Sequence, residues 1–380
     1  MAPRTPRAAG AALLLLATAS SGLFVPVTHP AVSVAGRYAV NADGSYGFDW
    51  PGVSFFLSIN GTATARVVLN GTQVSRLVTS AAFPALGADF EISRVWVGPG
   101  LAAAADNSYV VAAALSPTTA YTLRVTHDLS AGQIKTYATG VPLNLYGFII
   151  DDGAEVLPAA AGGLPFARSL EFVGDSITVG AGAEGAPPGP CPYSSFLEHN
   201  SGTWDRMLCA NLTANCSVVA WSGKGLYANA NGEGEVMPQY YRQTLGAGNL
   251  TTDWDFARFT PDAVIVHLGT NDMSSPSRHA PGFAANFTAA FVAFVLDLTR
   301  VRYRAPRLPV FVALGPMNVS PVLVAALQAV LAGVAAGGGN ASLLDLAGAA
   351  QDGCGAHPGP VGHQMMAAAA RAQLTAALGW

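Results

Sequence analysis

Residues 174–180 read Gly-Asp-Ser-Ile-Thr-Val-Gly, and this stretch decides the fold class of the chain. It follows a short apolar run, residues 170–173, which has the length and composition of a buried strand. A serine on a sharp turn at the carboxyl end of a parallel strand presents its hydroxyl to a ligand-binding crevice. The same letters also fit a plain turn in which Ser176 only caps a backbone amide.

The sequence after residue 166 alternates between apolar runs of strand length and runs of helical periodicity. Five strands with intervening helices predict a doubly wound parallel sheet for residues 166–380. Ligands bind such sheets outside the carboxyl ends of the strands. The predicted strands are 170–173, 217–221, 263–268, 310–314 and 343–346, and the predicted helices are 203–212, with Thr203 as N-cap, 283–300, 321–334 and 362–378.

Polar residues follow these predicted strands at the ligand-binding edge. Ser176 follows the first strand, Gly223 the second, Asn271 the third and His357 the fifth. Acyl transfer needs a nucleophile, a base and hydrogen-bond donors for the oxyanion. Ser176 is the expected nucleophile and His357 the expected base, because imidazole titrates near neutral pH. The expected oxyanion donors are the backbone amides of Ser176 and Gly223 and the side-chain amide of Asn271.

Residues 32–150 show no long helical periodicity. Short runs rich in Val, Phe, Tyr and Thr recur between turn signals, and Asn60-Gly61 and Asn70-Gly71 are strong hairpin signals. The pattern predicts an all-β sandwich or jelly roll, joined to the second domain by a Gly/Ala/Pro-rich linker at 151–165. Its aromatic residues fit a core better than a sugar-binding surface; they include Trp50, Phe55, Phe56 and Trp96.

Residues 1–19 have the pattern of a secretory signal peptide. Arg4 and Arg7 precede an apolar run at 8–16 and the small-residue site Ala17-Thr18-Ala19. The alternative is an N-terminal membrane anchor; no other stretch is expected to span a membrane, so we expect no membrane association after cleavage. Sequons for N-glycosylation also favour secretion. They begin at Asn60, Asn70, Asn211, Asn215, Asn249, Asn286, Asn318 and Asn340.

Composition narrows the class of partner. Apolar residues make up 51% and charged residues 11% of the chain, and the net charge is −4. The chain has no basic run, which argues against nucleic acid as a partner. The oligomeric state is left open by the sequence.

Four cysteines in an oxidising compartment suggest two disulfides, with three possible connectivities. Cys209 and Cys216 are close in sequence, between a predicted helix and the next strand, and are the natural local pair. Cys191 and Cys354 then remain for the second bond. The cysteine spacing matches no zinc pattern, so we expect no metal.

The set formed by Gly174-Asp175-Ser176, the glycine after the second strand, Gly269-Thr270-Asn271-Asp272 and His357-Pro358 resembles the GDSL/SGNH hydrolase superfamily over residues 170–380. The resemblance implies a flavodoxin-like three-layer sandwich without metal or organic cofactor. A closer resemblance is to carbohydrate esterase family 2, which joins a β jelly roll to an SGNH domain and removes acetyl groups from sugars, xylan included. The stretches that carry it are Trp221 to Leu226, Met237-Pro238, Gly353-Cys354 and Gly36-Arg37.

The chain departs from the superfamily pattern at the third catalytic position. The superfamily usually has an aspartate three residues before the histidine, and Cys354 stands there in this chain. Either Asp352 reaches the His357 ring by another loop path, or a backbone carbonyl orients the ring and the site is a Ser-His dyad. Family 2 is similar in tolerating loss of this aspartate, which favours the dyad.

The sequence therefore predicts a secreted carbohydrate O-acetyl esterase that acts on xylan-like or mannan-like saccharides through a serine acyl-enzyme. One alternative is a lipid or generic carboxylester hydrolase of GDSL type, although the chain has no extended apolar lid segment. The other is a non-catalytic carbohydrate-binding protein. The intact Ser176, Asn271 and His357 argue against that second alternative.

Overall fold

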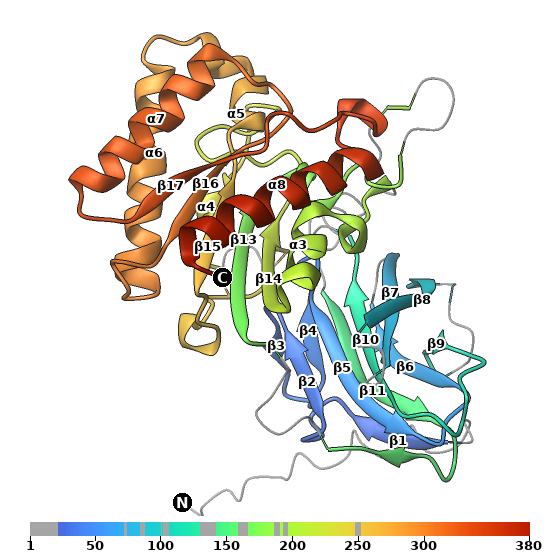
Figure 1. The fold of residues 1–380 in the computed structure, drawn as a ribbon. Coiled ribbons are helices and arrows are strands. Elements are labelled where there is room, and N and C mark those ends of the chain that lie inside the picture. The colour runs from blue at the N-terminus through green and yellow to red at the C-terminus, as the bar shows by residue number, and fades with distance from the viewer. Residues whose placement is uncertain are drawn as a thin grey trace, which may run out of the picture.

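The computed structural model describes residues 22–71, 74–83, 88–99, 101, 106–129, 142–158, 166–185, 191–192, 197–247 and 252–380. The predicted signal peptide, the sequon at Asn249 and residues 159–165 of the predicted linker lie outside these residues. The first part of the chain forms two antiparallel sheets, here called the β module, and the second part forms a parallel sheet with helices, here called the α/β module (Figure 1). The two-part fold class predicted from the sequence is confirmed.

The β module packs its two sheets face to face around buried side chains such as Phe55, Leu123 and Phe148. One sheet has the order β3-β4-β11-β6-β9 with β1 on β11, and the other has β12-β5-β10-β7-β8 with β2 on β5. The strands are β1 (Leu23–Pro26), β2 (Val32–Ala35), β3 (Ala39–Val40), β4 (Tyr46–Phe48), β5 (Ser54–Asn60), β6 (Ala65–Asn70), β7 (Ser75–Phe83), β8 (Ala88–Val97), β9 (Ser108–Ala112), β10 (Tyr121–His127), β11 (Leu143–Ile150) and β12 (Glu155–Val156).

The β module differs from the sequence expectation in its connections and its ends. The Asn60-Gly61 and Asn70-Gly71 turns are not hairpins, because β5 and β7 lie in one sheet and β6 in the other. The turn chemistry is local, whereas the sheet that the next strand joins is set by packing. The sheets also extend beyond 32–150, since β1 pairs with β11, and β12, inside the expected linker, pairs with β5.

The aromatic residues of the β module divide into two groups. Trp50, Phe55 and Phe56 are buried, as expected of core residues. Trp96 is not a core residue: its side chain is 36% exposed, and the guanidinium of Arg76 lies 5.4 Å from its ring centre.

The α/β module contains the expected five-stranded parallel sheet, in the order β14-β13-β15-β16-β17. Its strands are β13 (Arg168–Gly174), β14 (Ala214–Ala220), β15 (Ala263–His267), β16 (Val310–Leu314) and β17 (Ala341–Asp345). Its helices are α2 (Ser176–Val179), α3 (Trp204–Leu212), α4 (Met237–Tyr240), α5 (Thr270–Ser274), α6 (Phe283–Asp297), α7 (Pro321–Ala336) and α8 (Pro360–Leu378), with a π-helical turn after α6 at Leu298–Arg302 and 3₁₀ turns at Asn200–Gly202, Phe256–Arg258, Pro276–His279 and Cys354–Ala356.

Helices cover both faces of the parallel sheet. Helices α3 and α8 pack on one face, and α6 and α7 on the other (Figure 1). The run Phe283–Arg302 is long and apolar enough to cross a membrane by length and composition, contrary to the sequence expectation. Its Phe287 and Phe291 are buried in the core on the sheet, so in this fold the run is a covering helix. Thr203 occupies the N-cap position of α3, but its hydroxyl donates to the Asn200 carbonyl instead of capping the helix.

A buried ion pair joins the two modules. Arg37, which follows β2, reaches Glu171 in the middle of β13 at 3.1 Å, and both side chains are fully buried. The Arg37 guanidinium also donates to the carbonyls of Tyr241 and Gln243. The hydroxyl of Tyr303 donates to Glu171 at 2.6 Å. This pairing fixes the β module against the middle of β13.

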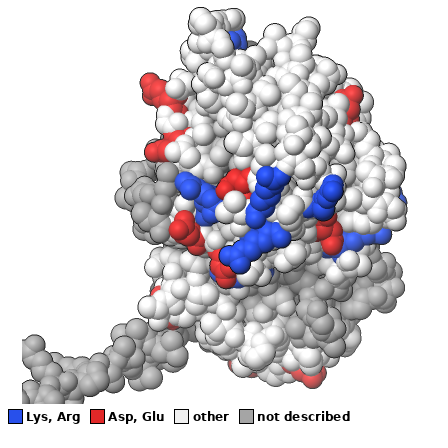
Figure 2. Space-filling view, turned by 90° about the vertical axis from the view of Figure 1, so that its left-hand side faces the viewer, with Lys and Arg blue, Asp and Glu red and all other residues white. Residues whose placement is uncertain are grey.

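The disulfide pairing expected from the cysteine positions is confirmed. Cys191 bonds Cys354 across 163 residues, and Cys209 bonds Cys216 across 7. On the face in Figure 2, Lys and Arg side chains gather around the middle with Asp and Glu between them. That face is of mixed charge and lacks the uniform basic surface typical of nucleic-acid binding.

Candidate active site

The turn after β13 places Ser176 at the start of α2. Asp175 caps this helix by accepting a hydrogen bond from the Ile177 amide at 3.0 Å. Gly174 has to be a glycine here, because a Cβ atom would lie 2.1 Å from the Thr178 hydroxyl. The geometry leaves Ser176 only 5% exposed, at the carboxyl edge of the sheet. Asp175 therefore has a structural part in the turn.

The structure brings His357 to Ser176 across 181 residues of sequence. The Ser176 hydroxyl and His357 Nε2 are 2.8 Å apart, which is hydrogen-bond distance for a nucleophile and its base. The other ring nitrogen, Nδ1, faces the carbonyls of Cys354 at 3.2 Å and Gly355 at 3.1 Å. A proton on Nδ1 would leave Nε2 as the acceptor that a general base needs.

Burial lowers the pKa of His357, although its bonds to the Cys354 and Gly355 carbonyls act in the opposite direction. The ring is 8% exposed, so its charged form loses most of its hydration. A neutral imidazole at physiological pH is the form that can accept the Ser176 proton.

Asp352, the possible third member, serves the next helix. Its carboxylate accepts from the amides of Gly359 at 2.8 Å, Val361 at 3.0 Å and Gly362 at 2.9 Å, at the start of α8. Burial alone would raise the pKa of Asp352, but these amide donors outweigh it and the pKa is lowered. The carboxylate thus acts as a cap for a helix N-terminus.

The two expected oxyanion donors besides Ser176 lie on the neighbouring strand ends. The amide of Trp221 donates to the Gly174 carbonyl at 3.2 Å, which holds the chain before Gly223 beside the nucleophile turn. Gly223 has φ +82°, and a Cβ built on it meets no atom within 4 Å, so open space adjoins it. Asn271 lies at the start of α5 and its Nδ2 donates to Asp175 Oδ2 at 3.2 Å.

The side-chain amide of Asn271 is already occupied. Besides Asp175, its Nδ2 donates to the Lys224 carbonyl at 2.9 Å. Burial raises the pKa of Asp175 to about 7. Both donors of the Asn271 NH₂ group are engaged, so an oxyanion that binds this amide has to displace one of these two bonds.

Two other histidines have no place in the catalytic pair. His363 lies inside α8, and its Nδ1 accepts from the Trp204 amide at 3.2 Å. His267 is the last residue of β15, and neither of its ring nitrogens has a hydrogen-bond partner within the described part of the chain. Burial lowers the pKa of His267 to about 4 and is the largest cause that lowers the pKa of His363 to about 3.

Sequence reasoning missed two buried acids that bond the loops around this site. Glu198 is fully buried, and its carboxylate accepts from the Ser222 hydroxyl at 2.5 Å, next to Gly223. Asp128 of the β module is also buried and lies 3.0 Å from the His199 ring. No local motif in the sequence marks these residues, because their partners lie 24 and 71 residues away along the chain.

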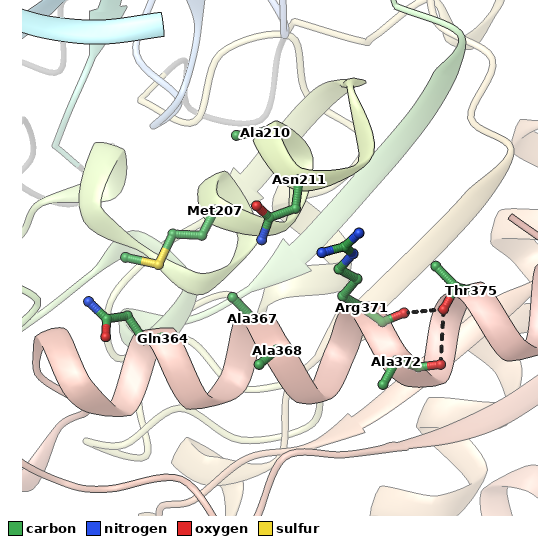
Figure 3. Close-up of a pocket in the computed structure, with 9 residues that line it drawn as sticks. All are labelled: Met207, Ala210, Asn211, Gln364, Ala367, Ala368, Arg371, Ala372 and Thr375. Carbon is green, nitrogen blue, oxygen red and sulfur yellow. Dashed lines mark hydrogen bonds between the residues drawn. The ribbon is translucent and has the colours of Figure 1, made fainter. Parts of the chain in front are cut away.

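Two hollows of the described surface do not contain the Ser176–His357 pair. A groove of about 600 Å³ lies between α3 and α8, where Met207 and Asn211 stand opposite Ala367 and Arg371 (Figure 3). A second hollow, of about 280 Å³, lies between residues 227–236 and 277–286. Two of its lining residues, Tyr227 and Ala228, donate their amides to Asp272, which follows Asn271 in the chain. Within the described residues no cluster of three or more His, Cys, Asp or Glu could hold a metal ion.

Comparison with known proteins supports the resemblance seen in the sequence. The model of the GDSL-like lipase/acylhydrolase family matches residues 172–365, which include both Ser176 and His357. The chain is 32% identical over 157 residues to the cellulase/esterase CelE of Acetivibrio thermocellus, a match covering 40% of this chain and 18% of that protein. It is 31% identical over 153 residues to an acetylxylan esterase/glucomannan deacetylase of Cellvibrio japonicus, covering 38% and 39%.

The chain thus spans less than half the length of either curated relative. Among solved structures, a carbohydrate esterase family 2 enzyme with a carbohydrate-binding domain, from Corynascus thermopiles (Myceliophthora fergusii), superposes with a TM-score of 0.70. The identity is 26%, and the match covers 92% of this chain and all of that one. The similarity therefore extends over both the β module and the α/β module.

Proposed function

We propose that this chain, a member of the GDSL-like lipase/acylhydrolase family, is a carbohydrate O-acetyl esterase that works through a serine acyl-enzyme. The observation that carries the proposal is the buried contact of 2.8 Å between the Ser176 hydroxyl and His357 Nε2. The names of the relatives, an acetylxylan esterase/glucomannan deacetylase and a cellulase/esterase, favour acetylated saccharides as substrates.

The reaction follows from the groups present. Ser176 Oγ attacks the acetyl carbonyl while His357 Nε2 takes the hydroxyl proton, and a tetrahedral oxyanion forms. The amides of Ser176 and Gly223 and the side chain of Asn271 would stabilise that charge. The C–O bond to the sugar then breaks, and His357 returns the proton to the leaving sugar oxygen. Water, deprotonated by His357, attacks the acetyl-serine and releases acetate and free Ser176.

Secretion is the second part of the proposal. Two disulfides persist best in an oxidising compartment. Several sequon asparagines are exposed on the described surface, where a glycan can be carried; they are Asn70, Asn211, Asn286, Asn318 and Asn340.

The test is acetate release from acetylated xylan, acetylated glucomannan and a long-chain lipid ester, measured side by side. We expect release from at least one saccharide, and Ser176→Ala should abolish it while circular dichroism shows a native fold. Preferential cleavage of the lipid ester would favour the generic esterase. Saccharide binding without acetate release would favour the non-catalytic alternative.

A further inference from the structure

One segment, residues 197–203, runs along the nucleophile turn and connects it to the β module. The His199 amide donates to the Gly180 carbonyl at 3.0 Å, at the end of α2. The Asn200 side chain donates to the Thr178 carbonyl at 2.9 Å. These bonds fix the segment against the helix that begins with the nucleophile.

The same segment reaches the oxyanion loop through Glu198. The Glu198 carboxylate is fully buried and accepts a hydrogen bond from the Ser222 hydroxyl at 2.5 Å. This hydrogen bond holds the Ser222 side chain against the segment. Ser222 and Gly223 share one peptide unit, and that unit carries the Gly223 amide. Holding the Ser222 side chain therefore restricts the direction in which this amide points.

Two charged residues of the β module bind the same segment. The Arg76 guanidinium of β7 donates to the Glu198 carbonyl and lies 2.7 Å from the Asp128 carboxylate. Asp128 in turn accepts from the Ser201 amide at 2.8 Å and lies 3.0 Å from His199 Nδ1. The Arg76 and Asp128 side chains are almost completely buried, so each needs its partner in place.

We infer that Glu198 is a positioning residue for the oxyanion loop and that Arg76 and Asp128 of the β module hold it in position. The inference rests on the proposed function for the role of the Gly223 amide. The β module then contributes to the reaction rate although it supplies no reacting atom. Because an oxyanion donor acts only when negative charge develops, a misdirected Gly223 amide lowers kcat and leaves KM unchanged.

The experiment compares Ser222→Ala and Glu198→Gln with wild type on p-nitrophenyl acetate. Removing an oxyanion donor outright costs about 10²–10³ in kcat, and a misdirected donor costs less. We expect Ser222→Ala to lower kcat about tenfold and Glu198→Gln at least about threefold, with KM within about twofold in both. Ser222→Thr keeps the hydroxyl and should recover most of the lost kcat.

Glu171→Gln is the matched control. Glu171 is also a fully buried glutamate of the α/β module that bonds the β module, but it lies in the middle of β13. Its variant should lower the melting temperature without changing kcat of the folded protein. Asp128→Asn, in the β module, should lower kcat in the same way as Glu198→Gln.

The inference is overturned if Ser222→Ala or Glu198→Gln keeps kcat within about twofold of wild type, or if Glu171→Gln lowers kcat as much as Glu198→Gln. A fluorophosphonate that labels Ser176 provides a second rate, which needs no saccharide substrate. If Ser176 is labelled but no acetate is released from saccharides, the proposed function is contradicted. The labelling rates of the variants still test this inference in that case. A wild type inert to both reagents would contradict both.

Discussion

At the scale of single residues, the question that the site raises is what orients the catalytic imidazole. His357 Nδ1 faces two backbone carbonyls, and the nearby Asp352 is engaged by three backbone amides at the start of α8. A carbonyl fixes the tautomer as a carboxylate does, but it carries no charge to stabilise the imidazolium. Two predictions separate these arrangements.

The first prediction concerns pH. Since burial lowers the folded-state pKa of His357 from 6.5, the ring stays neutral down to a lower pH than a free imidazole does. Activity needs the neutral ring, so it is full above the folded pKa and lost as pH falls through it. The acidic limb of kcat/KM should have its midpoint below 6.5 in a pH profile with p-nitrophenyl acetate. A midpoint above 6.5 would indicate a carboxylate partner.

The second prediction concerns Asp352→Asn. If carbonyls orient His357, this change should lower kcat by less than about tenfold, whereas loss of a true triad aspartate costs about 10⁴. The variant should also lose about 0.5–1 kcal/mol of stability, because the carboxylate no longer supports the N-terminus of α8. Kinetics and urea unfolding measure the two effects. A thousandfold loss in folded protein would show that Asp352 belongs to the catalytic machinery.

At the scale of elements, the loop that carries His357 depends on a covalent tie. Cys354 contributes one of the carbonyls that face the ring, and its sulfur is bonded to Cys191 in the region after the nucleophile. The Gly355 amide also donates to the Cys191 carbonyl at 2.9 Å. The bond therefore joins the histidine loop to the serine side of the site.

The third prediction compares the two disulfides. In the chain-entropy model, a bond across 163 residues stabilises by about 5 kcal/mol and one across 7 residues by about 2.5 kcal/mol. Cys191→Ser/Cys354→Ser should therefore lose more stability than Cys209→Ser/Cys216→Ser. It should also lower kcat, because the carbonyls that orient His357 are released. Chemical unfolding and kinetics at a temperature where both variants are folded provide the measurement. Equal kcat in the two variants would contradict this role.

At the scale of the whole molecule, we expect the two modules to unfold as one cooperative unit, because buried charges cross between them. Arg37 with Glu171 anchors one part of the interface, and Arg76 with Asp128 anchors another. Separating the modules would break these ion pairs. A charge that stays buried without its partner raises the free energy of the molecule, unless water hydrates it again.

The fourth prediction is a single calorimetric unfolding transition that Arg37→Ala shifts downward. The change leaves the buried Glu171 without its cation and should cost about 3–5 kcal/mol. Arg94→Ala is the control, because Arg94 pairs with Glu91 and, across the interface, with Glu184 at exposed positions, and exposed pairs contribute at most about 1 kcal/mol each. Two resolved transitions in wild type, or equal shifts in the two variants, would contradict a cooperative interface.

Features that depend on local pattern could be predicted from the amino-acid sequence. The apolar runs predicted the five parallel strands, and the strand-end positions predicted that Ser176, Gly223, Asn271 and His357 gather at one edge. The cysteine positions predicted both disulfides. These predictions hold because the period of apolar residues reports burial, and because parallel strands share the edge at which they end.

Features that depend on which loops meet became visible in the three-dimensional fold. At Asn60-Gly61, where the local signal predicted a hairpin, the chain crosses from one sheet of the β module to the other. The Asp352 carboxylate bonds the start of α8, and backbone carbonyls lie beside the His357 ring. Glu198 bonds Ser222 of the oxyanion loop through its carboxylate and Arg76 of the β module through its carbonyl. A residue pattern reports its near neighbours along the chain, whereas these contacts join segments whose approach is set by packing of the whole molecule.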